Sequence, residues 1–272
     1  MPELPEVETT RRGVAPHVER QKVTAVRVYD RRLRWPVPRD LARRLVGRTV
    51  DRVDRRSKYL LFRLGADTLL VHMGMTGSLR VFTQPPPKQP HDHVDLEFDN
   101  GIVLRYRDPR RFGRLLLGTE QALLSSKKMP RLGPEPIDPG FAPDELYRRL
   151  RKRRAAIKAV LLDQGAIAGV GNIYADESLH KARLRPDRIA GSLSKKSARR
   201  LHESLRESLT LAIANRGSSV DTYRDAWGEI GGQQEKLLVY GRAGEPCFTC
   251  GRPLSAIRIA GRTTVFCRRC QR

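Results

Sequence analysis

The chain has 272 residues, with 53 Lys and Arg against 30 Asp and Glu, so its formal net charge is +23 and its isoelectric point is about 10.8. An excess of positive charge on this scale favours a polyanion, and nucleic acid in particular, as the partner. No apolar run approaches the roughly 18 to 20 residues of a membrane-spanning helix, and the start lacks the apolar core of a secretion signal, so we expect no membrane association.

The chain opens with Met1, Pro2 and Glu3, which places a proline directly after the initiator methionine. Methionine is generally removed before a small residue, and its removal leaves the secondary amine of Pro2 free beside a carboxylate. The reference pKa of an α-amino group is about 8 against about 10.4 for lysine, so this nitrogen is more often neutral and nucleophilic near pH 7. Its product with an aldehyde is an iminium, which can drive elimination at neighbouring carbons. On residue type alone, an ordinary helix start is the favoured explanation of the same residues at this point.

A short helix is predicted over residues 5–12, closed by Gly13. It has proline at its first position, acidic residues in its first turn and arginines in its last turn, as helix ends prefer. The positive end of its dipole then faces Pro2, where it disfavours a charged amine and attracts phosphate.

Segments typical of β-strands follow this helix, with turns between them. They cover residues 23–29, 49–54, 59–64, 68–72, 94–98 and 102–107. Strict alternation of apolar residues from His93 to Phe98 predicts one buried and one solvated face. We therefore expect an N-terminal domain, residues 1–130, built as an antiparallel β-sandwich or barrel.

Five prolines and two glycines lie between residues 129 and 143, so neither a helix nor a sheet can run through this stretch, and we assign residues 131–143 to a linker. A helical period follows over residues 144–236. Helices are predicted there over residues 144–153, 155–164, 173–181 and 194–215. Residues 217–232, rich in glycine and serine, are expected to form a long loop of the kind that is often functional.

All four cysteines lie in the last region, residues 237–272, as Cys247-x-x-Cys250 and Cys267-x-x-Cys270. In a reducing compartment this spacing predicts a zinc site and not two disulfides. Four thiolates leave no position for a substrate, so the expected Zn²⁺ is structural, and the sixteen residues between the pairs suit a β-hairpin. The region from residue 241 onward holds seven Arg and one acidic residue, which suits phosphate.

Three further motifs fit nucleic-acid chemistry, and each also has an ordinary structural explanation. The turn 169–172 offers N–H donors to a phosphate, or it is a plain helix cap provided by Asn172. The turn 108–113 presents two arginines and Phe112, which suits a wedge that fills the gap left by an extruded base, or it is a solvated turn with Phe112 in the core. Lys58, before an apolar strand, is a functional amine or simply an exposed lysine.

Taken together, these residues resemble the formamidopyrimidine-DNA glycosylase family, and the resemblance spans essentially the whole chain. The motifs that carry it are residues 2–6, 72–77, 91–93, 111–113 and 169–174 and the four-cysteine finger. The resemblance implies an α+β protein of two domains: an N-terminal antiparallel β-sandwich with an N-terminal helix, and a helical helix-two-turns-helix domain plus a β-hairpin zinc finger. It also implies a base-excision repair enzyme that removes oxidised purines (8-oxoguanine, formamidopyrimidines) from damaged double-stranded DNA and then nicks the strand by β,δ-elimination.

The resemblance assigns roles to individual residues. Pro2 is the imine-forming nucleophile and Glu3 the acid that handles protons at the sugar. Lys58 is the proton donor for β-elimination and Arg262, between the cysteine pairs, the donor for δ-elimination. The matching positions for DNA contact or for filling the gap are His72, Met75, His91, Arg110, Arg111, Phe112, Arg153 and Asn172.

Two of these matches carry a difference from the family. Arg153 stands where the family often has lysine, which keeps the charge but binds phosphate with a planar fork. The loop 217–225 matches the region that closes over the extruded base, but its sequence varies among members, so its base contacts are not assigned.

Two alternative functions remain open. The related endonuclease VIII branch prefers oxidised pyrimidines, but it typically has glycine in place of Leu4 and generally lacks the turn 108–113. A non-enzymatic zinc-ribbon DNA-binding protein explains the charge and the cysteines, but not Pro2 and Glu3 at the terminus.

His91-Asp92-His93 is a poor metal site, because no further ligand lies nearby in the sequence. We expect a monomer in a bacterial cytoplasm, associated with the nucleoid through DNA.

Overall fold

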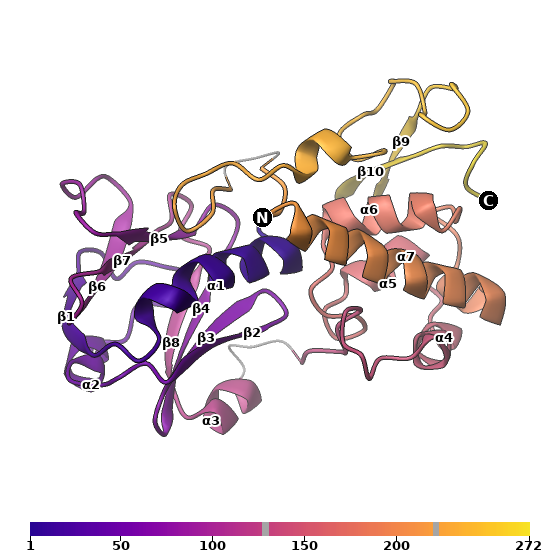
Figure 1. Cartoon of the computed structure of the whole chain (residues 1–272). Coiled ribbons are helices and arrows are strands. Elements are labelled where there is room, and N and C mark those ends of the chain that lie inside the picture. Colours follow the sequence, from indigo (N-terminus) through magenta and orange to yellow (C-terminus); the bar gives the residue numbers. More distant parts are fainter. Residues whose placement is uncertain (127–130, 220–222) are drawn as a thin grey trace. The chain divides into compact units, whose positions relative to one another are not determined.

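The computed structural model describes the chain in three stretches (Figure 1). These are residues 1–126, 131–219 and 223–272. The boundary predicted at residue 130 lies outside the described residues, as do residues 220–222 of the predicted loop.

Contacts divide the chain into two units. The first comprises Met1–Met129 with Asn215–Gln234, and the second comprises Pro130–Ala214 with Glu235–Arg272. The loop 217–232, which its position in the sequence assigns to the helical domain, therefore makes its described contacts within the first unit. The four-part division of the chain otherwise stays a prediction.

The first unit contains two four-stranded antiparallel sheets. One sheet has the order β1 (Val23–Val28), β6 (Asp92–Phe98), β7 (Val103–Arg107) and β5 (Ser78–Phe82). The other has the order β2 (Arg52–Arg56), β3 (Tyr59–Leu64), β4 (Asp67–His72) and β8 (Arg114–Gly118). Their apolar side chains share one core, which confirms the predicted β-sandwich. Strands β5 and β8 were not among the predicted segments.

Helix α1 (Leu4–Val18) begins where a helix is predicted but continues past the predicted end at residue 12. Gly13 does not stop it. A Cβ at this position would lie 2.7 Å from the Cβ of Ala226, so the glycine serves close packing of the helix on the loop. The first unit also contains two shorter helices, α2 (Leu41–Leu45) and α3 (Glu120–Ser125).

Most of the polar side chains of β6 are buried, which contradicts the solvated face predicted for residues 93–98. His93 and Asp95 are both buried, and only Glu97 is partly exposed. The reason lies on β7, where the buried Arg105 places its guanidinium 2.7 Å from Asp95 and 3.2 Å from Asp92. Because buried charges persist when they are paired, this cluster can cover the polar face. Alternation in the sequence reports polarity but does not show whether water reaches it.

The second unit is helical and carries a hairpin (Figure 1). Its helices are α4 (Pro143–Arg151), α5 (Ile157–Leu162), α6 (Asn172–Lys181) and α7 (Lys195–Ala214). The hairpin pairs β9 (Ser255–Ile259) with β10 (Arg262–Phe266), and the unit also contains the 3₁₀ turn η1 (Ala190–Ser192). A second 3₁₀ turn, η2 (Gln233–Lys236), begins in the first unit and ends in the second. The helical domain and its hairpin finger are thus confirmed. Within the described stretches, no helix is both long and apolar enough to cross a membrane.

Candidate functional site

The start of helix α1 holds Pro2 and Glu3, and both residues are buried. Glu3 is the N-cap residue and forms a capping box with Glu6, whose Oε2 accepts a hydrogen bond from the Glu3 backbone N–H at 2.9 Å. Such a box satisfies N–H groups that a helix start leaves unpaired. A helix start and a reactive amine are therefore compatible, since the helix holds Pro2 beside the positive end of its dipole.

Glu6 was not predicted as a site residue, yet its carboxylate ties helix α1 to the loop of the same unit. Its Oε1 accepts a hydrogen bond from the Ser218 N–H at 2.8 Å, and the Tyr223 hydroxyl donates to the Glu6 carbonyl oxygen at 2.9 Å. Gly217 has φ +77°, and a Cβ there would lie 3.0 Å from Oε1. The spacing Glu3-x-x-Glu6 signals the capping box in the sequence. A contact between residues 212 positions apart has no local signal.

Lys58 lies directly before β3 and is only 5% exposed, so the interpretation as an exposed lysine is wrong. Burial, reinforced by the positive charges of Arg114 and Lys58, lowers the pKa of His72 on β4 to about 3. The neutral ring accepts a hydrogen bond at Nδ1 from the Gly74 N–H at 3.1 Å. His72 therefore supports the turn that follows it, and its predicted DNA contact stays a prediction.

Two turns of the first unit, residues 72–77 and 108–113, are locked together by backbone contacts. The buried Asp108 accepts hydrogen bonds from the Thr76 hydroxyl at 2.9 Å and from the Gly113 N–H at 2.8 Å. Gly74 has φ +63°, and a Cβ there would lie 2.5 Å from the Gly113 nitrogen. No side chain larger than hydrogen fits at this crossing, so the glycines set the distance between the turns.

These turns carry Met75 and the residues expected to fill the gap in DNA. Phe112 is 42% exposed, so its predicted alternative place in the core is wrong. The Arg110 guanidinium lies 4.8 Å from the centre of the Phe112 ring, and Arg111 has φ +60° and an Nη2 3.1 Å from Asp30 Oδ2. An exposed ring with one guanidinium over it, on a rigid turn, fits the predicted wedge for a base stack, and that role stays a prediction.

The cluster 91–93 separates into one exposed and two buried residues. His91 is exposed with φ +73°, and its carbonyl oxygen accepts a hydrogen bond from the Asp108 N–H at 3.1 Å. The ring nitrogens of the buried His93 lie 3.1 Å and 3.0 Å from the carbonyl oxygens of Asp30 and Asp108. His91 is therefore available to a ligand, while His93 braces the turn.

In the second unit, Asn172 does not cap helix α6, so the alternative explanation as a plain helix cap is wrong, and its predicted DNA contact stays a prediction. Gly171 is the N-cap, and Asn172 is the first helical residue. Its Nδ2 instead donates to the Thr263 carbonyl oxygen at 3.1 Å, because β10 lies against this end of the helix. Arg153 is exposed and pairs with Asp163 at 3.3 Å.

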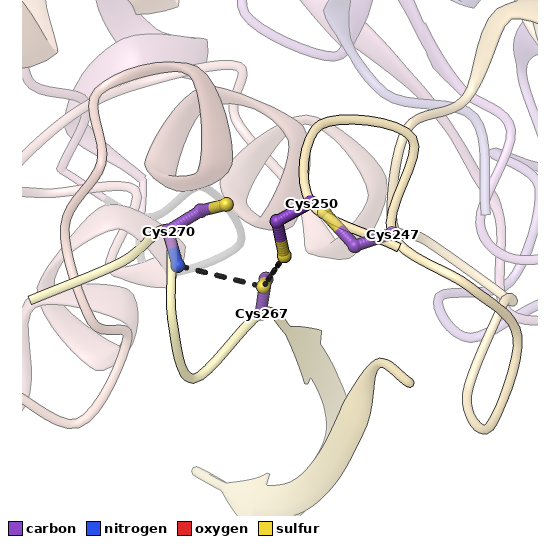
Figure 2. A group of neighbouring side chains, drawn as sticks. All are labelled: Cys247, Cys250, Cys267 and Cys270. Atoms are coloured by element: carbon purple, nitrogen blue, oxygen red, sulfur yellow. Dashed lines mark hydrogen bonds between the residues drawn. The ribbon is translucent and has the colours of Figure 1, made fainter. Parts of the chain in front are cut away.

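The four cysteines converge at the base of the hairpin (Figure 2). Their sulfur atoms all lie within 4.8 Å of one another, and the Sγ atoms of Cys250 and Cys267 are 3.5 Å apart. Zn–S bonds of about 2.3 Å in a tetrahedron imply sulfur separations of about 3.8 Å. The set fits one structural Zn²⁺, held by Cys247, Cys250, Cys267 and Cys270.

Arg262 begins β10 directly after the hairpin turn. Ala260 and Gly261 have φ +49° and +72°, the left-handed pair typical of a two-residue hairpin turn. The predicted site residues thus fall into two groups. Pro2, Glu3, Lys58, His72, Met75, His91, Arg110, Arg111 and Phe112 lie in the first unit, and Arg153, Asn172, Arg262 and the cysteines in the second.

Three family models match consecutive parts of the chain. The formamidopyrimidine-DNA glycosylase N-terminal domain matches residues 1–115, and the H2TH domain of the same glycosylase matches residues 132–224. The zinc finger found in FPG and IleRS matches residues 244–272.

Whole proteins match over their full length. The formamidopyrimidine-DNA glycosylases of Hahella chejuensis and Geobacter sulfurreducens are 47% and 46% identical over 100% of both chains. Among solved structures, a Lactococcus lactis FPG mutant in complex with Fapy-dG-containing DNA has a TM-score of 0.91 at 38% identity, covering 99% of each chain. The MutM (FPG) protein of Thermus thermophilus has a TM-score of 0.88 at 44% identity, covering 99% of this chain and 98% of that one. This chain therefore belongs to the formamidopyrimidine-DNA glycosylase family.

Proposed function

We propose that this protein is a bifunctional DNA glycosylase and abasic-site lyase that excises 8-oxoguanine and formamidopyrimidines from double-stranded DNA. The observation that carries the proposal is the buried Pro2 and Glu3 pair at the start of α1 in a chain that aligns throughout with an FPG solved on Fapy-dG-containing DNA. The charge of +23 supports a DNA partner.

The reaction begins with attack of the Pro2 nitrogen on C1′ of the damaged nucleotide. The glycosidic bond breaks, the base leaves, and Glu3 supplies a proton as the sugar ring opens to an iminium. Because the iminium withdraws electrons, C2′ can lose a proton, and the bond between C3′ and the 3′ phosphate oxygen then breaks. Lys58 and Arg262 act as proton donors in β- and δ-elimination. The second elimination releases the 5′ phosphate oxygen, and hydrolysis of the iminium frees Pro2.

The two locked turns supply the groups that open the duplex. Extrusion of a base costs a few kcal/mol of lost stacking, and a side chain that fills the gap offsets part of this cost. The exposed Phe112 and the neighbouring Arg111 and Met75 are placed on adjacent turns to do so.

The oligomeric state and the cellular location of the protein are also proposals. Strong positive charge opposes self-association, which supports a monomer. Four cysteines remain zinc ligands in a reducing compartment, which supports a bacterial cytoplasm with the protein drawn to the nucleoid by DNA.

The alternatives are less well supported. Leu4 is buried in α1, and the turn 108–113 is intact, in contrast to the pattern expected of the endonuclease VIII branch. The alternative of a non-enzymatic zinc-ribbon protein does not explain why Pro2 and Lys58 are buried.

A lesion panel tests the proposal. The protein is incubated with matched duplexes that contain 8-oxoguanine opposite cytosine, an oxidised pyrimidine or no lesion, and borohydride is added to reduce any iminium. We expect a covalent adduct and base release mainly with 8-oxoguanine. Preference for the oxidised pyrimidine would instead establish the endonuclease VIII activity, and no adduct with any duplex would refute the enzyme.

A further inference from the structure

The hairpin that carries Arg262 is joined to the helices of its own unit by a buried ion pair. Lys158 on α5 and Asp176 on α6 are 2.7 Å apart, with side-chain exposures of 0% and 1%. Nothing in the proposed chemistry uses either residue. Two charges are costly to bury unless geometry and hydrogen bonds compensate, so their contacts are informative.

Each charge reaches the residues that follow Arg262 on β10. Lys158 Nζ donates to the Thr263 carbonyl oxygen at 3.1 Å and to the Thr264 hydroxyl at 2.8 Å. Asp176 Oδ2 accepts a hydrogen bond from the Val265 N–H at 3.0 Å. Three consecutive residues of the strand are therefore fixed to two helices.

The same carbonyl oxygen also accepts the Asn172 side chain. Thr263 thus receives donors from Lys158 at 3.1 Å and from Asn172 at 3.1 Å. Since Asn172 ends the turn 169–172, which is predicted to bind phosphate, and begins α6, one peptide unit connects that turn to the strand that starts with Arg262.

We infer that Lys158 and Asp176 are positioning residues for Arg262, which hold it at a fixed distance from the phosphate turn so that δ-elimination can follow β-elimination. This inference rests on the proposed role of Arg262. A side chain displaced by about 1 Å can lose on the order of a hundredfold in rate, so a rigid mount of this kind affects chemistry and not only folding.

The test separates position from stability by comparing three variants on DNA with a preformed abasic site. Arg262→Ala is the reference. Lys158→Met leaves Asp176 as an unpaired buried charge and is expected to destabilise the protein. The double variant Lys158→Met with Asp176→Leu removes both charges, so it is expected to regain thermal stability while β10 still lacks its side-chain anchors.

The readout is the ratio of δ- to β-elimination product in single turnovers, together with borohydride trapping, zinc content and melting temperature. We expect the double variant to keep one zinc and normal trapping but to lower the δ/β ratio by about tenfold or more. If the double variant regains stability and also a wild-type ratio, the pair is only structural and the inference fails. If Arg262→Ala itself leaves the ratio unchanged, the proposed role of Arg262 fails instead.

Should the double variant fold poorly, Asp176→Asn is used in place of Asp176→Leu, and Lys158→Met is kept. Asn keeps the side-chain volume of Asp and an oxygen that can accept a hydrogen bond from the Val265 N–H. A wild-type δ/β ratio in Lys158→Met with Asp176→Asn, at any stability that permits trapping, would equally overturn the inference.

Discussion

The locked turns of the first unit and the hairpin of the second both present groups for DNA, but different forces hold them. The turns stand on a sandwich with an extensive core, and short backbone contacts at Gly74, Asp108 and Gly113 fix them. The hairpin has a much smaller apolar cluster around its metal site. Its buried members are Val239, Cys247, Leu254, Val265 and Cys267.

This difference shows that the two regions should fail in different ways. A module too small to build a core depends on metal or ionic contacts for its shape, so removing one contact releases several functional groups together. A turn supported by a large core loses only the group that is removed. Substitutions in the two regions should therefore differ in how many functional groups they disturb.

Blocking the Pro2 amine should have the largest effect and should be confined to chemistry. An added residue before Pro2, or retained Met1, converts the amine to an amide that cannot form an iminium. We expect borohydride trapping on 8-oxoguanine DNA to be abolished, with melting temperature and zinc content unchanged. Peptide mapping of the wild-type adduct provides the second measurement, and an adduct on Lys58 would show that the nucleophile is misassigned.

Cys250→Ser should damage the whole hairpin region at once. Loss of one thiolate weakens zinc binding, and the hairpin loosens because metal binding supplies much of the stability of so small a module. We expect less than one zinc per chain, DNA affinity weaker by on the order of ten- to a thousandfold at moderate salt, and a shallower dependence of affinity on salt. Zinc analysis and binding to an abasic-site analogue measure this. One zinc per chain with unchanged affinity would rule out the structural finger.

Phe112→Ala should impair only opening of the duplex. Without the ring, excision of 8-oxoguanine from an intact pair is expected to slow by about ten- to a hundredfold, which corresponds to a few kcal/mol of lost compensation. Cleavage at a preformed abasic site should change far less. Phe248→Ala is the matched control, because it removes an exposed ring that lies in the zinc finger and not on the turn 108–113. Equal losses of Phe112→Ala on the two substrates would count against a wedge.

His72→Asn should have the smallest effect on folding at neutral pH, and its consequence for folding should lie in the pH dependence of stability. The pKa of His72 is about 3 in the folded protein against an ordinary 6.5, so the unfolded chain binds a proton between these values and the folded chain does not. The stability that the neutral His72 ring contributes is thus fully present above about pH 6.5. It is lost as the pH drops toward 3, by an amount on the order of a few kcal/mol. The Asn side-chain oxygen can still accept a hydrogen bond from the Gly74 N–H. Urea unfolding at several pH values gives the free energy of unfolding as a function of pH. This free energy should change less with pH in the variant than in the wild type, and an identical dependence would contradict the assignment.

Local patterns predicted much of the fold and of the site. The helix at residue 5, six of the strands and the four helices of the second unit have strong periods or end signals, and these act over a few residues. The cysteine spacing predicted a zinc site for the same reason, since each pair lies within one turn of chain.

Exposure could not be predicted in this way. Local sequence favoured an exposed Lys58 and left Phe112 evenly divided between core and surface, whereas Lys58 is buried and Phe112 exposed. The solvated face predicted for β6 was also largely wrong, because Arg105 from another strand covers Asp92 and Asp95. Burial depends on which segments meet, and a residue's own neighbours in sequence carry little of that information.

By itself, the sequence determined most of the elements, the cysteine ligands and the family, because these rest on residue types at fixed spacing. Only the tertiary structure decided the contacts that hold functional groups in place. Glu6 meets Ser218 across 212 residues, and Lys158 meets Thr264 across 106. The cost of joining such distant segments is repaid by burial and hydrogen bonding in the folded core, so these partners are defined only once the chain has folded.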